Sequence, residues 1–142
     1  MNRRDFLTLS ATVTLAAPLG ALKARAGAPV PYTPGLVKAE LAKGRVVFVD
    51  FFATWCTTCA AQHRVMDKLR AENPAYEKAI SFVVVDWDTY KDAALSRELK
   101  IPRRSTLVVL KGEKELGRVV AGTSRAEIKA LMDTALSAAK SA

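Results

Sequence analysis

Cysteine is scarce in this sequence, and its scarcity excludes several classes of protein. The 142 residues include two cysteines and one histidine. Two thiols cannot form a disulfide framework, a four-thiolate zinc site or a thiolate-held iron–sulfur cluster within one chain. Glycine and proline are also few, at seven and six residues, and no collagen-like or heptad repeat is present. Any chemistry of the cysteines is therefore that of a single pair.

The composition also lacks the marks of a disordered chain. Hydrophobic residues make up 50% of the sequence and charged residues 25%. Such a chain has enough apolar surface to drive folding, and its length suits one domain that buries a core without disulfides. We therefore expect a single compact domain.

The amino-terminal segment resembles an export signal. Arg3 and Arg4 precede an uncharged run over residues 8–22, and Ala24 and Ala26 form an A-x-A cleavage site. The string NRRDFLT resembles a twin-arginine signal. We expect a signal peptide over residues 1–26 and a periplasmic protein. An uncleaved membrane anchor is the alternative, although the threonines and serine of the run, with Pro18 and Gly20, weaken it.

The formal charge of +8 is partly a property of this leader. Without its bases the domain keeps a mild positive excess, and the remaining charges are scattered rather than clustered with aromatic residues. Nucleic-acid binding needs a basic patch or stripe. We therefore expect no nucleic-acid partner.

The rest of the chain predicts an α/β domain. Three prolines, Pro29, Pro31 and Pro34, lie close together and predict an irregular linker over residues 27–35. The domain, residues 36–142, then shows helical patterns over residues 36–42, from the second cysteine to about residue 70, over residues 92–99 and after Ser124, and extended patterns over residues 46–52, 80–85, 107–110 and 116–120. Residues 111–113 suit a hairpin turn. This order predicts a sandwich with a mixed sheet of about four strands and helices on both faces.

The cysteine pair lies between the first long strand and the next helix, in the segment Trp55-Cys56-Thr57-Thr58-Cys59. A sulfur at a helix N-terminus ionises easily, because unpaired N–H groups and the helix dipole stabilise the thiolate. Cys56 occupies that position. Cys59 lies one turn further in and is placed to displace a mixed disulfide. We therefore expect Cys56 to be the nucleophile and Cys59 the less exposed thiol.

The segment FVDFFATWCTTC resembles the active-site segment of thioredoxin-like proteins. The later segments VVVDWD, STLVVLKGE and VVAGTS fall at the family's spacing, so that the resemblance covers about residues 36–136. It implies a thioredoxin-like three-layer sandwich and a thiol-disulfide oxidoreductase. Among these relatives the chain looks most like the exported thioredoxin-like proteins, and this resemblance implies a reductase of protein disulfides supplied by a membrane thiol donor. We expect a monomer without a bound cofactor.

Further site residues are implied beside the cysteines. Asp50, six residues before Cys56, matches the family's buried aspartate; a desolvated carboxylate there suits a general base for Cys59. The alternative is an aspartate at a strand end that faces water. Trp55 is expected to cover the disulfide, and Ser105 and Thr106 to contact the substrate.

Ser105 stands where the family has a cis-proline next to the disulfide. A cis bond before a residue other than proline costs about 2.5–4 kcal/mol. We therefore predict a trans Arg104–Ser105 bond that brings the Ser105 N–H and hydroxyl near the sulfurs and opens a polar groove. Taking Pro102 as the family's proline would instead place Arg103 and Arg104 inside the sheet. These arginines, with Lys100 nearby, either stabilise the Cys56 thiolate, select an acidic partner, or are solvated loop residues.

Two other interpretations of the cysteines remain. A fixed disulfide or inert buried thiols would have a structural role only, although so small a loop constrains the unfolded chain little. A copper or zinc carrier would bind metal through Cys56, Cys59 and His63, with an external fourth ligand. His63 on a helix surface is also compatible with simple solvation.

Overall fold

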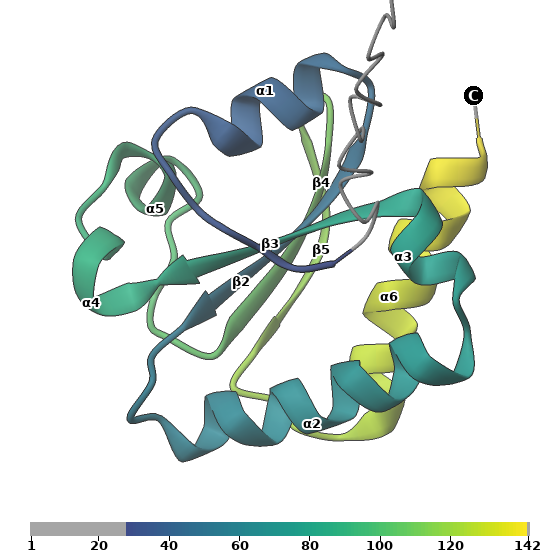
Figure 1. The fold of residues 1–142 in the computed structure, drawn as a ribbon. Helices are drawn as coiled ribbons and strands as arrows, with labels where there is room; N and C mark the ends of the chain where they lie inside the picture. Colours follow the sequence, from purple (N-terminus) through teal and green to yellow (C-terminus); the bar gives the residue numbers. More distant parts are fainter. Residues whose placement is uncertain (1–27, 142) are drawn as a thin grey trace, which may run out of the picture.

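The computed structural model describes residues 28–141, which form one α/β unit (Figure 1). The strands are β1 (Val30–Pro31), β2 (Val46–Phe52), β3 (Ile80–Asp86), β4 (Thr106–Lys111) and β5 (Lys114–Val120). The helices are α1 (Leu36–Ala42), α2 (Thr57–Glu72), α3 (Ala75–Ala79), α4 (Trp87–Tyr90), α5 (Ala94–Glu98) and α6 (Arg125–Lys140). The predicted order of long elements is confirmed.

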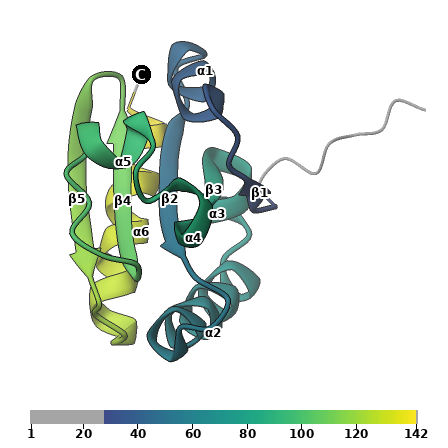
Figure 2. The same cartoon turned by 90° about the vertical axis from the view of Figure 1, so that its left-hand side faces the viewer.

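The five strands form a mixed sheet in the order β1-β3-β2-β4-β5. β1, β3 and β2 run parallel, whereas β4 is antiparallel to β2 and to β5. Figures 1 and 2 show α1, α4 and α5 on one side of the sheet and α2, α3 and α6 on the other. The α/β sandwich with helices on both faces is therefore confirmed.

The side chains of strand β2 pack alternately into two hydrophobic cores, one on each face of the sheet. Val46 and Phe48 pack in the cluster that contains residues of α2, α3 and α6, whereas Val47, Val49 and Phe51 pack in the cluster with α1 and α5. Because side chains alternate along a strand, Asp50 shares the face of Val46 and Phe48. The only charged residue of this buried strand therefore faces α2.

The predicted start of a helix after Ser124 and the predicted hairpin turn are also confirmed. The Ser124 hydroxyl accepts the N–H of Glu127 at 3.2 Å and caps α6. Gly112 has a φ of 58° in the hairpin between β4 and β5, a conformation that glycine adopts at little cost. Asn73 and Pro74 separate α2 from α3, because a residue before proline disfavours the helical conformation.

Two predictions about local structure are wrong. Residues 28–35 contain a short strand, because Val30–Pro31 pairs with the edge of β3 and Tyr32 N–H donates to the Val84 carbonyl at 2.8 Å. Proline is tolerated there because an edge strand has a side without a ladder partner. This strand raises the sheet from four strands to five. The predicted helix over residues 92–99 is shorter, and α4 precedes it as a separate turn.

The predicted signal peptide over residues 1–26 lies outside the described residues. Among the helices within residues 28–141, none combines the length and the apolar character that crossing a membrane requires.

Candidate active site

The ends of two antiparallel strands bring the candidate site together. β2 leads into the loop that carries Cys56, and Ser105 immediately precedes β4. Phe51 pairs with Thr106 in the register of these strands, and the Ser105 N–H donates to the Phe51 carbonyl at 2.8 Å. Ser105 therefore lies beside the cysteine loop, although it is distant in sequence.

Both cysteines are reduced and buried at the start of α2. Cys56 is the N-cap residue, and its sulfur accepts the Cys59 N–H at 3.2 Å. The exposed fraction is 5% for Cys56 and 0% for Cys59. The predicted placement of Cys56 at the helix N-terminus and the lower exposure of Cys59 are confirmed.

Ser105 contacts both sulfurs. Its hydroxyl oxygen lies 3.1 Å from the Cys56 Sγ and 3.0 Å from the Cys59 Sγ. Every peptide bond within residues 28–141 is trans, so the predicted trans Arg104–Ser105 bond is confirmed, as is the position of the hydroxyl. Ser105 has a φ of 62°, a left-handed conformation that a residue with a Cβ seldom adopts.

Two details predicted for Ser105 are wrong. Its N–H points to the Phe51 carbonyl rather than to the sulfurs, because the residue continues the pairing of β2 with the chain entering β4. The open polar groove is also absent at this residue. Ser105 is fully buried, since its hydroxyl packs directly against the two sulfurs.

The surroundings separate the acidities of the two thiols. Burial opposes ionisation of Cys56, but hydrogen bonds from the Cys59 thiol, the Ser105 hydroxyl, the Cys59 N–H and Arg104 outweigh it and lower the pKa of Cys56 to about 7. Burial and the neighbouring Cys56 sulfur raise the pKa of Cys59. The order agrees with a nucleophilic Cys56 and a Cys59 that holds its proton.

Trp55 is exposed beside the cysteines and held from two sides. Its indole N–H donates to the Asp88 carboxylate, at 2.9 Å from Oδ2, and the Arg104 guanidinium carbon lies 4.3 Å from the ring centroid. Such a cation over an indole face is attracted by the ring. Trp55 is 57% exposed, so its accessible ring borders the site. Its expected role as a cover for the disulfide stays a prediction.

Thr106 is fully buried, and its hydroxyl donates to the Arg103 carbonyl at 2.7 Å. This bond supports the loop before β4. Its predicted contact with substrate stays a prediction.

Asp50 is buried as predicted, and it contacts His63, the residue named above as a possible metal ligand. The exposed fraction of Asp50 is 4%, and burial raises its pKa despite the hydrogen bond to His63. Asp50 Oδ2 contacts His63 Nε2, whereas Oδ1 is buried without a hydrogen-bond partner in the described residues. No hydrogen bond joins Asp50 to Cys59 within residues 28–141.

This contact removes the support for the proposed metal ligand set. His63 turns its Nε2 to Asp50. Within residues 28–141, no three histidine, cysteine or acidic side chains are grouped closely enough to hold a metal ion. Cys56 and Cys59 instead share the Ser105 hydroxyl.

Sequence reasoning missed Gln62, which ties the site together. This buried side chain donates through Nε2 to the carbonyls of Ser105 and Gly122, each at 2.9 Å. A signal was present: Gln62 falls on the same helical stripe as the buried Cys59, Met66 and Leu69. A polar residue on a buried stripe predicts a partner inside the protein.

Known proteins resemble this chain over most of the described fold. The thioredoxin family matches residues 32–134. A thioredoxin of Echinococcus granulosus is 34% identical over 96 residues, which cover 68% of this chain and 83% of that protein. Thioredoxin-2 of Saccharomyces cerevisiae is 39% identical over 92 residues, covering 64% and 82%. The crystal structure of Trxlp from Edwardsiella tarda matches with a TM-score of 0.64 and 30% identity, covering 73% of this chain and 98% of that one.

The comparisons and the site agree. The family match spans strands β2 to β5, the paired thiols and α6 up to residue 134. Cys56 and Cys59, two residues apart, supply the dithiol that thiol-disulfide exchange requires. From this match and this dithiol it follows that the chain belongs to the thioredoxin family and is a thiol-disulfide oxidoreductase.

Proposed function

We propose that this oxidoreductase is an exported reductase of protein disulfides. The Cys56 thiolate attacks a substrate disulfide, so that one substrate thiolate leaves and a mixed disulfide forms on Cys56. The Cys59 thiol loses its proton to Asp50 through one bridging water and attacks the Cys56 sulfur. The second substrate thiolate leaves, and the Cys56–Cys59 disulfide closes. An external dithiol donor, which we propose to lie in the membrane, restores both thiols.

The observation that carries this cycle is the asymmetric environment of the two sulfurs. The hydrogen bonds at the start of α2 lower the pKa of Cys56 to about 7, whereas burial raises that of Cys59. Attack therefore begins at Cys56, and Cys59 reacts only after it loses its proton.

The reducing direction is supported by the same acidity. A very acidic nucleophile, with a pKa of about 3.5, stabilises the reduced form and makes an oxidant, whereas a pKa of about 7 accompanies reducing members of this class. Cys56, at about 7, falls with the reductants.

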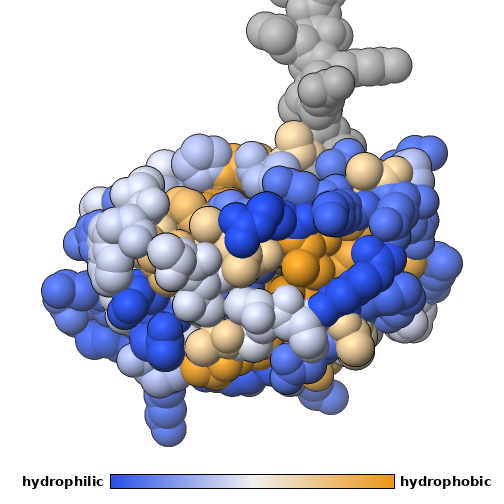
Figure 3. All heavy atoms as spheres, turned by 90° about the horizontal axis from the view of Figure 1, so that it is seen from below, coloured by the Kyte–Doolittle hydropathy of each residue, from blue (hydrophilic) through white to orange (hydrophobic). Residues whose placement is uncertain are grey.

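A protein substrate is supported by the apolar surface near the thiols. Trp55 and Val120 are large hydrophobic side chains exposed to solvent, and Val120 pairs with Thr106 beside Ser105. On the face where α2 lies, Figure 3 shows apolar surface between strongly hydrophilic side chains. Apolar surface of this kind is typical of protein docking.

Trapping tests the cycle. We expect Cys59→Ser to accumulate mixed disulfides with protein partners through Cys56, and Cys56→Ser to accumulate none. Partners recovered equally from both variants would contradict the assigned order.

Export is tested separately with the leader. We expect residues 1–26 to carry a folded reporter out of the cytoplasm, and the double substitution of Arg3 and Arg4 by lysine to retain it. A reporter that stays inside with the unchanged leader would contradict the proposed location.

A further inference from the structure

We infer that His63 carries the proton between the buried Asp50 carboxylate and solvent, and so acts as a positioning residue for the resolving step of the cycle. The inference rests on the proposed function of Asp50 as the base for Cys59. It assigns to His63 a role that is neither metal binding nor simple solvation.

The first support is the contact itself. Asp50 points from β2 toward α2, and its Oδ2 contacts the Nε2 of His63. The side chain of Asp50 is 5% exposed and that of His63 is 31% exposed. His63 is therefore a titratable group that touches the buried carboxylate and also reaches solvent.

The second support is the fixed orientation of the imidazole. The ring of His63 stacks on Phe52, with 4.2 Å between centroids and 13° between planes. Phe52 in turn packs against the cluster of Ala53, Cys56 and Cys59. Nδ1 has no hydrogen-bond partner within residues 28–141, so the second ring nitrogen is available to exchange a proton. An imidazole held in this orientation can accept a proton at Nε2, beside Asp50, and release a proton from Nδ1 to solvent.

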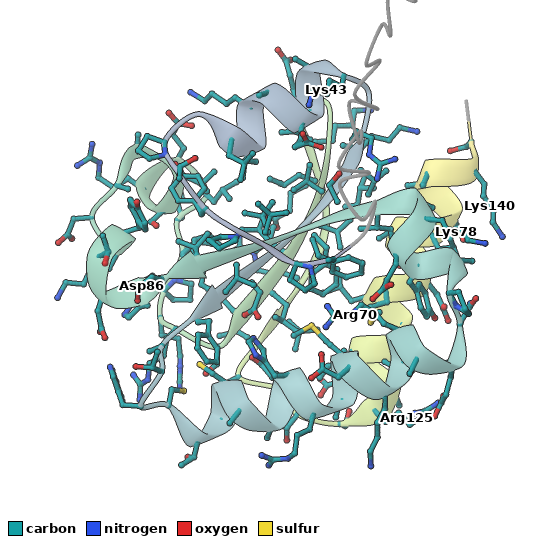
Figure 4. The ribbon with its side chains drawn as sticks, in the orientation of Figure 1. Lys43, Arg70, Lys78, Asp86, Arg125 and Lys140 are labelled. Atoms are coloured by element: carbon teal, nitrogen blue, oxygen red, sulfur yellow. The ribbon has the colours of Figure 1, made fainter. Side chains whose placement is uncertain are left out.

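The third support is a cavity of about 170 Å³ at the pair, between α2 and β3. Its charged lining consists of Asp50, His63, Asp67 and Arg70; the β3 wall is apolar, formed by Phe82, Val83 and Val84. Figure 4 shows Arg70 reaching from α2 toward the sheet. The polar route from Asp50 to the surface therefore runs along α2.

The charges around the cavity suit a group that alternates between two protonation states. The hydrogen bond to the Asp50 carboxylate raises the pKa of His63, with a smaller contribution from Asp67 in the same direction and from Arg70 in the opposite one. Burial raises the pKa of Asp50, while His63 and Arg70 lower it. The two groups thus titrate as a coupled pair, in which the charge of each affects the other.

The proton balance of the step is simple. The Cys59 thiol gives its proton through the proposed bridging water to the Asp50 carboxylate, and the Cys59 thiolate forms the new S–S bond while the bond between Cys56 and the substrate breaks. Asp50 then passes the proton to His63 Nε2, and His63 releases a proton from Nδ1 to solvent. Asp50 is again a carboxylate, and His63 now carries its proton on Nε2. When the donor later reduces the disulfide, the reverse transfer restores the starting state: solvent protonates Nδ1, and the Nε2 proton returns through Asp50 to the Cys59 thiolate.

A purely structural role for His63 and a role in proton transfer predict different effects of the same substitutions. If the contact only fixes α2 on the sheet, a side chain that preserves the hydrogen bond preserves function. In His63→Gln the amide can donate to Asp50 but does not titrate. In His63→Ala the contact is lost and space is left for added imidazole.

The test follows the reaction of the reduced protein with the chromogenic disulfide dithiobis(nitrobenzoate) by stopped flow. The first released thiolate reports attack by Cys56, and the second reports resolution by Cys59. In His63→Gln we expect an unchanged first phase and a second phase that is at least about tenfold slower near neutral pH, because positioned proton transfer contributes about 10²–10⁴-fold. The pH profile of the second phase should also lose an inflection.

Two further variants sharpen the result. In His63→Ala we expect added imidazole to accelerate the second phase in proportion to its concentration. Lys68→Gln, which removes an exposed charge from the same helix, should leave both phases unchanged. A second phase in His63→Gln within about twofold of the unmodified protein at every pH, or no response of His63→Ala to imidazole, would overturn the inference.

Failure of the inference is distinguishable from failure of the proposed cycle. If Asp50→Asn slows the second phase and His63→Gln does not, Asp50 is the base and only the role of His63 is wrong. If Asp50→Asn also leaves the second phase unchanged, the assigned base is wrong. If Cys59→Ser still releases the second thiolate, the proposed cycle itself is wrong.

Discussion

The hydroxyl of Ser105 lies 3.1 Å from the sulfur of Cys56, although 49 residues separate them along the chain. The same oxygen lies 3.0 Å from the sulfur of Cys59. A hydroxyl shared between two sulfurs stabilises whichever one carries the negative charge.

Removal of this hydroxyl should weaken the thiolate. In Ser105→Ala we expect the pKa of Cys56 to rise by about one unit, because hydrogen bonds to charged groups contribute about 1.5–3 kcal/mol and one unit corresponds to 1.36 kcal/mol. The rate of alkylation by iodoacetamide at pH 6 should fall about tenfold. Ser105→Gly is the matched control for backbone strain, since glycine accepts the φ of 62°. Equal alkylation of the original protein and both variants would contradict the assigned role.

Asp50 should make the protein less stable as the pH rises. Burial raises its pKa above the unfolded value, and the hydrogen bond to Asp50 raises that of His63. Groups whose pKa is raised on folding bind protons more tightly in the folded state, so their contribution is present at low pH and is lost as the pH passes the folded pKa.

In Asp50→Asn this loss should disappear. We expect the variant to gain free energy of unfolding relative to the original protein between pH 5 and pH 8.5, as measured by urea denaturation of the reduced proteins. A difference between the two proteins that is the same at both pH values would show that Asp50 does not titrate in this way.

Arg104 should tune the nucleophile as well as hold Trp55. Its guanidinium stacks on the Trp55 ring and contributes to the low pKa of Cys56. In Arg104→Gln we expect that pKa to rise by about half a unit, since half a unit corresponds to about 0.7 kcal/mol, within the range of about 0.5–1.5 kcal/mol for a typical hydrogen bond. The dependence of Cys56 alkylation on salt should weaken at the same time. Arg103→Gln removes the neighbouring charge and should have a smaller effect on both readouts; a larger effect than in Arg104→Gln would reverse the assignment.

Gln62 should stabilise the site more through its hydrogen bond to the Gly122 carbonyl than through its hydrogen bond to the Ser105 carbonyl. The Ser105 carbonyl also accepts the Ala121 N–H at 2.8 Å, so Gln62→Leu leaves mainly the Gly122 carbonyl without its partner. An unsatisfied buried group costs about 1–3 kcal/mol. We expect urea denaturation to show a loss of that size in the free energy of unfolding. The dependence of this free energy on urea concentration should be unchanged. A loss below about 0.5 kcal/mol would mean that solvent replaces the amide.

The long elements could be predicted from sequence because their signals are local. The β-branched and aromatic run of β2 and the capping serine of α6 each act within a few residues. β1 could not be predicted, because two residues form a strand only where β3 offers a free edge. α4 was missed because a four-residue helix carries no periodic pattern.

Some residues of the site could likewise be predicted from local sequence, whereas others depend on tertiary packing. Cys56 and Cys59 form a local motif, and the position of Cys56 at the helix start follows from it. The contact between Asp50 and His63 depends on which face of β2 meets which side of α2, and that is decided by packing. The hold of Asp88 on Trp55 depends in turn on α4, the element that the sequence did not predict.

The antiparallel register of β2 and β4 also determines where the chain can change length. Phe51 opposite Thr106 holds Ser105 beside the cysteine loop, so an insertion of one residue in either strand end would turn alternate side chains to the wrong face. The connection over residues 87–104 runs outside this register, and loops of that kind accept insertions. A peptide tag or a sensor domain should therefore be tolerated between α4 and α5 while the distance between the hydroxyl and the sulfurs is retained.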